Sequence, residues 1–107
     1  MIARRWTARA TRGGAAAYTA FFERELVPQL RGIEGHMGAL VMTRDAEVVE
    51  ITVLTFWASM EAIARFAGPS PDVAVVEPEA RAVLQSFDDR VVHQAVAIDT
   101  LRTGPGE

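Results

Sequence analysis

The stretch EITVLTFWASMEAIARFAG, from Glu50 to Gly68, decides the fold because it changes from strand to helix in a single step. Its first part alternates with a period of two, which is typical of a strand, and this strand ends at Trp57. Ser59 then matches the preferred N-cap residue of a helix, and Gly68 followed by a proline matches its end. The sequence predicts a strand–helix corner whose indole either fills the core or lines a pocket.

The strand that leads to this corner, predicted over Val48–Trp57, is apolar on both faces. Its apolar side chains alternate, with Val49, Ile51 and Val53 on one side and Val48, Leu54 and Phe56 on the other. A strand of this kind has to be covered on both faces. We expect helices of the same chain on one face and a second copy of the chain on the other.

Three more strands and two more helices follow from the same patterns. The strands are predicted over Ile2–Arg9, where a TRGG turn follows, over Ala39–Arg44 and over Arg90–Ile98. A helix is predicted from Gly14 to about Arg31, bent or ended near Pro28, and more helix over Ser70–Phe87, broken at Pro78.

The resulting order is strand, helix, strand, strand, helix, strand. This α+β order is the ferredoxin-like split β-α-β arrangement, a four-stranded antiparallel sheet with helices on one face. Because the other face would be bare and apolar, we expect a homodimer formed sheet to sheet. The length of 107 residues predicts one domain over residues 1–100 and a polar C-terminal tail over residues 101–107.

Composition excludes several classes of function. A net charge of −3 does not fit an extended nucleic-acid footprint. The absence of Cys excludes disulfides, thiolate metal sites and thiol nucleophiles, and the absence of Lys excludes Schiff-base chemistry. No stretch approaches the roughly 18–20 apolar residues of a membrane span. We therefore expect a cytoplasmic protein with a small-molecule ligand and no nucleic-acid or membrane partner.

Two residues are candidates for catalysis. His93 lies mid-strand with small neighbours on its face, where a neutral imidazole could act as general base. The alternative is an ordinary core or interface histidine. Arg4 would stabilise a phenolate or enolate if its face of the first strand lines a pocket, and would be a solvated surface residue otherwise.

Further candidates for ligand contact are aromatic. Trp6 shares a strand face with Arg4, and Tyr18 and Phe22 fall on the apolar stripe of the first helix. The two helical side chains either line a pocket floor or simply pack. Glu77 and Glu79 could act as carboxylate bases but are typical of a solvent-facing helix.

A metal site is not expected. His36 lies in the glycine-rich GIEGHMG stretch, which predicts a solvated loop position. Two histidines this far apart, with no Cys, lack the spacing of metal ligands.

Four stretches also carry a family resemblance: LVPQLRGIEGHMGALVMTR, ITVLTFWASMEAIARFAG, AVVEPEARAVLQSF and VVHQAV. Together they cover nearly the whole chain, and the second is the most specific. They resemble the antibiotic biosynthesis monooxygenase (ABM) domain family of the dimeric α+β barrel superfamily.

The resemblance implies a homodimer with a pocket between each sheet and its helices. It further implies a small cofactor-independent monooxygenase acting on an aromatic or polyketide-type molecule, with Trp57 on the pocket wall and no cofactor. An acidic, phenol-like substrate would be deprotonated, and its carbanion would pass an electron to dioxygen.

The chain also departs from the family pattern. It contains no Asn, and Val53 stands where the polyketide enzymes have a polar residue. Haem degradation would need an Asn near Arg4 and a His where the chain has VVEPEA, so the sequence argues against it. The alternative function is a non-oxygenase ligand-binding protein, or an isomerase or cyclase-type enzyme of the same superfamily.

Overall fold

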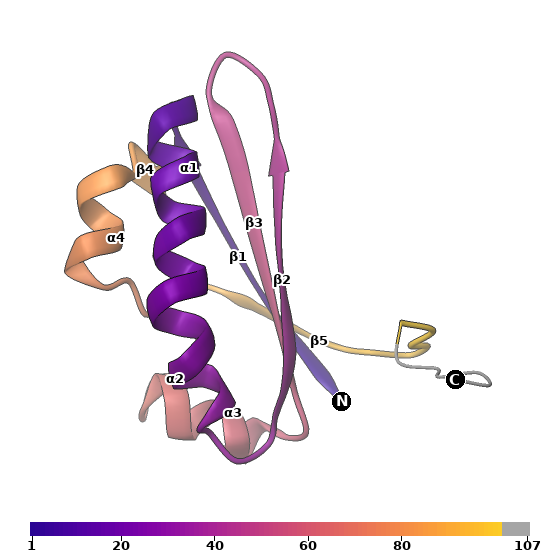
Figure 1. Ribbon diagram of the computed structural model, residues 1–107. Coiled ribbons are helices and arrows are strands. Elements are labelled where there is room, and N and C mark those ends of the chain that lie inside the picture. Colours follow the sequence, from indigo (N-terminus) through magenta and orange to yellow (C-terminus); the bar gives the residue numbers. More distant parts are fainter. Residues whose placement is uncertain (102–107) are drawn as a thin grey trace.

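The computed structural model describes residues 1–101 as one antiparallel sheet with helices on one face (Figure 1). The strands are β1 (Ile2–Ala10), β2 (His36–Arg44), β3 (Val49–Trp57), β4 (Ser86–Phe87) and β5 (Val92–Ala95). The helices are α1 (Arg12–Phe21), α2 (Val27–Arg31), α3 (Met60–Ala67) and α4 (Pro78–Val83), and the π-helical turn η1 (Phe22–Leu26) joins α1 to α2. The rest of the predicted tail, residues 102–107, lies outside the described residues.

The sheet has the predicted antiparallel split β-α-β topology. Its strands run in the order β2, β3, β1, and both β4 and β5 pair with the free side of β1. The predicted strand over Arg90–Ile98 is therefore shorter than expected, and the fourth position of the sheet is shared by two short strands. β1 lies at the centre, so its side chains reach elements from both ends of the chain.

The helix after β1 begins earlier than the TRGG sequence suggests. Thr11 is its N-cap, because its hydroxyl oxygen accepts a hydrogen bond from the Gly14 N–H at 3.0 Å. Arg12, Gly13 and Gly14 thus form the first helical turn rather than a separate turn. A glycine is required at the last of these positions, because a Cβ on Gly14 would lie 2.3 Å from the carbonyl oxygen of Val83.

The helix does not end at Pro28, which was one of the two outcomes predicted for it. The N–H of Val27 donates to the carbonyl oxygen of Phe22, five residues back, which is the hydrogen bond of a π turn. Pro28 then falls in the first turn of α2, where its missing N–H is not needed. The helical path therefore continues to Arg31 with one widened turn in it.

The prediction of helix over Ser70–Phe87 is largely wrong. Only α4 is helical, and residues 69–77, here called the strap, run irregularly beside the chain that precedes β5. The Ala74 N–H donates to Asp89 O at 2.8 Å, and the Val91 N–H donates to Asp72 O at 2.9 Å. Two prolines in the strap lack backbone donors and disfavour helix for the residues before them.

The core lies between the helices and one face of β3 and β1. Trp57, Ile51 and Ile63 are its largest fully buried side chains. The opposite face of the sheet, here called the outer face, is uncovered in the single chain and carries Leu40, Met42, Leu54 and Phe56. Leu40 and Met42 are 40% and 43% exposed. No helix among residues 1–101 is long and apolar enough to cross a membrane.

Two adjacent glycines of α1 predict opposite effects on stability. Gly13→Ala should raise the free energy of unfolding by about 0.5–1 kcal/mol, because no atom lies within 4 Å of the added Cβ and alanine favours helix. Gly14→Ala should lower it by about 1–3 kcal/mol, because its Cβ would overlap a backbone carbonyl that has to move away. Urea unfolding of both variants measures these changes. Equal changes of the same sign in the free energy of unfolding would contradict the packing of α1 against α4.

Candidate functional site

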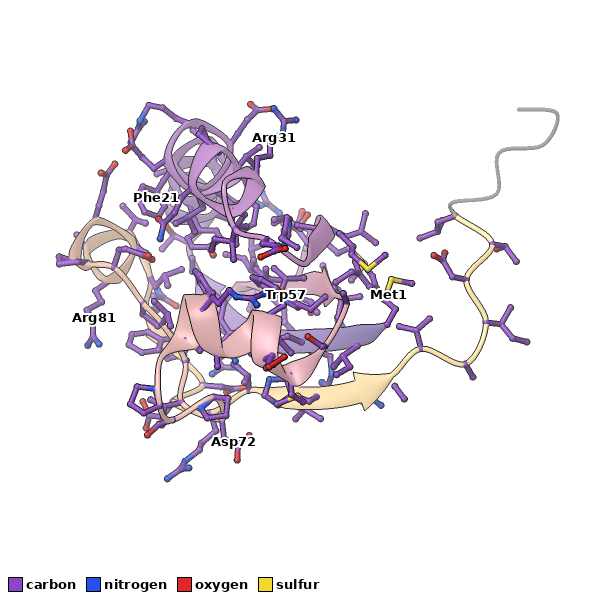
Figure 2. The ribbon with its side chains drawn as sticks, turned by 90° about the horizontal axis from the view of Figure 1, so that it is seen from below. Met1, Phe21, Arg31, Trp57, Asp72 and Arg81 are labelled. Atoms are coloured by element: carbon purple, nitrogen blue, oxygen red, sulfur yellow. The ribbon has the colours of Figure 1, made fainter. Side chains whose placement is uncertain are left out.

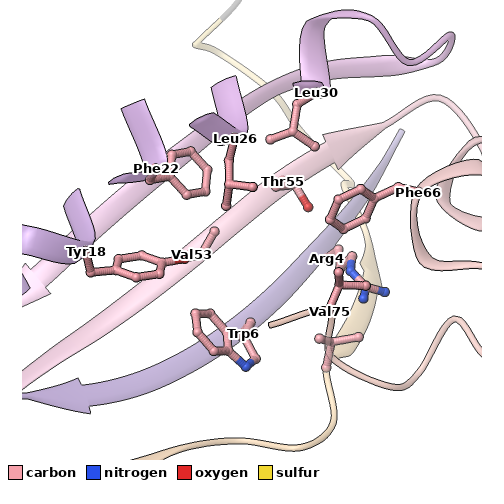
Figure 3. A pocket seen from close by; sticks show the side chains of 11 residues that line it. Arg4, Trp6, Tyr18, Phe22, Leu26, Leu30, Val53, Thr55, Phe66 and Val75 are labelled. Carbon is pink, nitrogen blue, oxygen red and sulfur yellow. The ribbon is translucent and has the colours of Figure 1, made fainter. Parts of the chain in front are cut away.

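A cavity of about 50 Å³ lies between the sheet and the helices (Figure 3). Its wall is mostly apolar and aromatic, with a few polar groups. It is lined by Arg4 and Trp6 of β1, by Val53 and Thr55 of β3, by Tyr18, Phe22, Leu26 and Leu30 of the long helical path, and by Phe66, Val75 and Val91.

Arg4 places a buried positive charge on this wall. The residue is 4% exposed, and its guanidinium donates to the carbonyl oxygens of Pro71 and Val73 in the strap. It also lies over the Phe66 ring, with Cζ 5.8 Å from the ring centroid. Among residues 1–101 no carboxylate forms an ion pair with Arg4. Burial lowers its pKa, and the charge of Asp72 partly offsets that effect, but a guanidinium stays charged.

His93 lies behind Arg4 rather than on the cavity wall. Its Nε2 is 3.2 Å from Nη1 of Arg4, and its Nδ1 is 3.4 Å from Oδ1 of Asp72. Because arginine can only donate, Nε2 has to accept, so the proton of the neutral ring belongs on Nδ1 facing the carboxylate. Burial first and then the charge of Arg4 lower the pKa of His93, while Asp72 acts against them. The imidazole therefore holds Arg4 in place.

Two hydroxyl groups complete the polar part of the wall. Thr55 accepts a hydrogen bond from the Trp57 indole N–H at 2.8 Å, which leaves its own hydroxyl hydrogen to donate elsewhere. Tyr18 is buried, and burial together with the charge of Glu77 raises its pKa well above the usual range. It stays a protonated donor. Arg4, Thr55 and Tyr18 can thus each donate a hydrogen bond, which suits a ligand that carries negative charge on oxygen.

Trp57 is not among the residues that line this cavity. It is fully buried near the centre of the fold (Figure 2), and it stacks on Phe66 with ring centroids 5.7 Å apart. It therefore supports the wall from behind, through its ring contact with Phe66 and its hydrogen bond to Thr55. The expectation that its indole lines the pocket is replaced by this supporting position.

Of the other residues predicted from sequence, Arg4, Trp6, Tyr18 and Phe22 come together on one cavity. The indole N–H of Trp6 donates to Asp88 O at 2.8 Å, so Trp6 presents its ring to the cavity and has no donor left for a ligand. Thr55 and Phe66 were missed. The alternation of β3 could have revealed Thr55, since it is the polar residue on the face that Val53 and Trp57 share.

His36 differs from its predicted place, whereas Glu79 is exposed, as expected of a solvent-facing helix. His36 begins β2, is partly buried, and lies edge-on to Trp57 with ring centroids 4.9 Å apart, so the predicted solvated loop position is wrong. Glu79 pairs with Arg24 on the surface, and Glu77 precedes α4 near Tyr18. Within residues 1–101 no group of three or more potential metal ligands lies together.

Comparison with known proteins supports the fold. No family model and no curated protein matches this sequence. A solved structure of a candidate antibiotic biosynthesis monooxygenase from Bacillus cereus matches with a TM-score of 0.63 and 16% identity, over 92% of this chain and 95% of that one. A second, from Chloroflexus aurantiacus J-10-fl, matches with a TM-score of 0.55 and 21% identity, over 92% and 94%.

This chain has the fold of those two proteins. The resemblance drawn from the sequence is thereby confirmed as a structural match over nearly the whole chain. Identity at this level shows the fold and leaves the chemistry to be argued from the site.

The position of His93 predicts a pH-dependent stability. Its pKa is lowered from 6.5, so the unfolded chain takes up more protons than the folded protein as the pH falls below that value. The stabilisation is complete above about pH 6.5 and is lost as the pH falls toward the folded pKa. Between about pH 7.5 and 5.5 the free energy of unfolding should fall less in His93→Gln than in the wild type.

Urea unfolding at the two pH values measures this difference. Gln94→Ala, a neutral change at the neighbouring exposed position, should keep the wild-type dependence. Identical pH dependence in His93→Gln and the wild type would show that His93 does not titrate differently on folding.

Proposed function

We propose that this protein is a small cofactor-independent monooxygenase that acts on an aromatic or polyketide-type molecule, bound as its oxyanion beside Arg4. The observation that carries the proposal is the buried guanidinium on an otherwise apolar, aromatic wall, with no carboxylate paired to it in the described chain. Burying an unpaired charge is costly. A site that buries an unpaired positive charge is suited to a negatively charged ligand.

The guanidinium would act by favouring the ionised substrate. Three of its five N–H donors are used within residues 1–101, on Pro71, Val73 and His93, so two remain for an oxyanion. On a mostly apolar wall, such donors lower the pKa of a phenol or an enolisable ketone, because they stabilise its anion. The proton then leaves to water, since no carboxylate or imidazole lies on the described wall.

Dioxygen is the oxidant in this proposal, and the reaction balances without a further reductant. The anion of an anthrone gives one electron to O₂, and the resulting radicals combine at the ring carbon to form a peroxide. Loss of water from the peroxide leaves a quinone. The substrate thus loses two hydrogen atoms and gains one oxygen atom, and the second oxygen atom leaves as water.

Arg4 is the binding residue in this scheme, and His93 positions it. His93 accepts from Arg4 and contacts Asp72, which fixes both the ring and the guanidinium. Trp57 and Thr55 act as a pair, in which the buried indole orients a hydroxyl that faces the ligand. Trp6, Tyr18 and Phe22 would contact the aromatic body.

One observation favours a second candidate, a protein that binds such an anion without oxygenating it or an isomerase or cyclase-type enzyme. His93, the imidazole that sequence analysis proposed as base, is turned toward Arg4 and not toward the cavity. A binding protein needs the charge and the rings but no base.

Oxygen uptake with an anthrone as substrate separates the two candidates. The wild type should consume O₂ faster than the buffer blank, and Arg4→Met should lower the rate about ten-fold or more, because it removes the charge that stabilises the anion. Arg4→Lys keeps the positive charge but loses the planar guanidinium and its paired donors, so it should retain part of the rate. Arg12→Met is the control, because Arg12 is exposed at the start of α1 and lines neither the cavity nor the outer face.

The outcomes are distinct when binding is followed in parallel by tryptophan fluorescence. Binding that depends on Arg4 without O₂ uptake would support the second candidate. Equal loss of binding in the Arg4 and Arg12 variants, or no binding to the wild type, would reject the site itself. Circular dichroism of each variant shows whether the fold is kept.

The assembly that fits this site is a homodimer formed through the outer face. Leu40 and Leu54 lie opposite each other on β2 and β3, and Met42 and Phe56 flank them. Apolar side chains gathered on one uncovered face are typical of a protein interface. A second copy of the chain presents the same face, so two copies could cover each other by a two-fold axis.

Leu54→Arg tests the dimer. The wild type should have about twice the chain mass of 11.7 kDa in sedimentation equilibrium, whereas the variant should be a monomer at micromolar concentration. Two buried arginines facing each other across the axis would repel and lose their hydration. Met60→Arg, at an exposed position of α3 away from the sheet, should stay dimeric, and a monomeric wild type would contradict the proposal.

A further inference from the structure

A second hollow lies on the other side of the cavity wall. It is a groove of about 440 Å³ between the helical path and the start of β2, lined among others by Val27, Arg31, His36 and Met37. Phe22 and Leu30 line both the groove and the cavity. These two side chains therefore form the partition between the two spaces.

The volumes show that an aromatic ligand needs both spaces. The cavity has about 50 Å³, whereas a protein cavity that binds a single benzene ring has about 150 Å³. The cavity beside Arg4 therefore has room for an oxyanion and little more. The groove alone falls within the range of about 300–1,000 Å³ that small-molecule sites occupy.

The partition is carried by the irregular part of the helix. Phe22 opens η1, and Leu30 follows in α2, so the π turn lies between the two residues that divide the hollows. Such π turns are rare, and they are frequent at functional sites. A rotation of Phe22 at this turn would join the cavity to the groove without changing the sheet.

The groove also carries a positive charge, that of Arg31, which does not line the cavity. Arg31 is exposed at the end of the helical path (Figure 2), and no carboxylate within residues 1–101 pairs with it. The ligand body would thus run from the buried guanidinium of Arg4 to the exposed guanidinium of Arg31.

From these features we infer that the groove is the second compartment of the ligand site, and that it binds the distal carboxylate of an aromatic molecule whose phenolate or enolate end lies beside Arg4. The inference rests on the proposed anion site at Arg4. The ligand class is an aromatic of at least two fused rings with an acid group at each end. Phe22 and Leu30 separate the two compartments when no ligand is bound.

Two naphthalene probes that differ by one carboxylate test the inference. The wild type should bind 6-hydroxy-2-naphthoate about three- to ten-fold more tightly than 2-naphthol, because only the former reaches Arg31 with a charge. Arg31→Gln should abolish that preference while leaving the affinity for 2-naphthol unchanged. Arg44→Gln, at the far end of β2, should keep the preference.

The partition is tested by a second pair of variants. Phe22→Ala removes one ring contact but joins the two spaces, so the affinity for 6-hydroxy-2-naphthoate, which needs both, should rise relative to that for 2-naphthol. Phe21→Ala removes an equal side chain that lines neither hollow and should leave this ratio unchanged. If Phe22→Ala unfolds, Arg31→Gln, which changes an exposed side chain, still tests the second compartment.

The possible results separate this inference from the function on which it rests. Equal affinity for the two probes in the wild type, or a preference that survives Arg31→Gln, would overturn the second compartment alone, provided that both probes still depend on Arg4. Failure of both probes to bind, or binding indifferent to Arg4→Met, would overturn the anion site and the compartment together.

Discussion

The structure depends on one buried guanidinium. Arg4 lies on the central strand, and it donates to two carbonyl groups of the strap and to the imidazole of His93. These bonds hold together three segments that are far apart in the sequence: the first strand, the loop before α4, and the last strand. The same group faces the cavity. The proposed chemistry and the architecture therefore depend on the same side chain, and replacing Arg4 would also act on the strap.

The sequence predicted the sheet better than the connections. Alternation in β3 and the Ser59–Gly68 pattern located the strand–helix corner correctly, because both rest on local preferences of backbone and side chain. The strap was mistaken for helix, since its hydrogen bonds go to residues near Asp89 and Val91, and no local pattern encodes such distant partners. The divided fourth strand was missed for the same reason.

The candidate site was also only partly accessible from the sequence. Strand periodicity placed Arg4 and Trp6 on one face without saying whether that face is inward, and helix periodicity placed Tyr18 and Phe22 on one apolar stripe; all four meet on one cavity. The role of Trp57 could not be obtained in this way, because periodicity gives the face of a residue and not its depth. An indole on the inner face can touch the ligand or lie one layer behind, and only the stacked Phe66 ring decides between them.

The π turn has a consequence for how this chain can vary. The π turn takes one residue more than an α turn to complete about one revolution, so the helical segments before and after it keep their faces. A homologue lacking one residue within Phe22–Leu26 would therefore form a regular helix with Tyr18 and Leu30 still on the cavity. A single deletion at this point would remove the widened turn while the outline of the site persists.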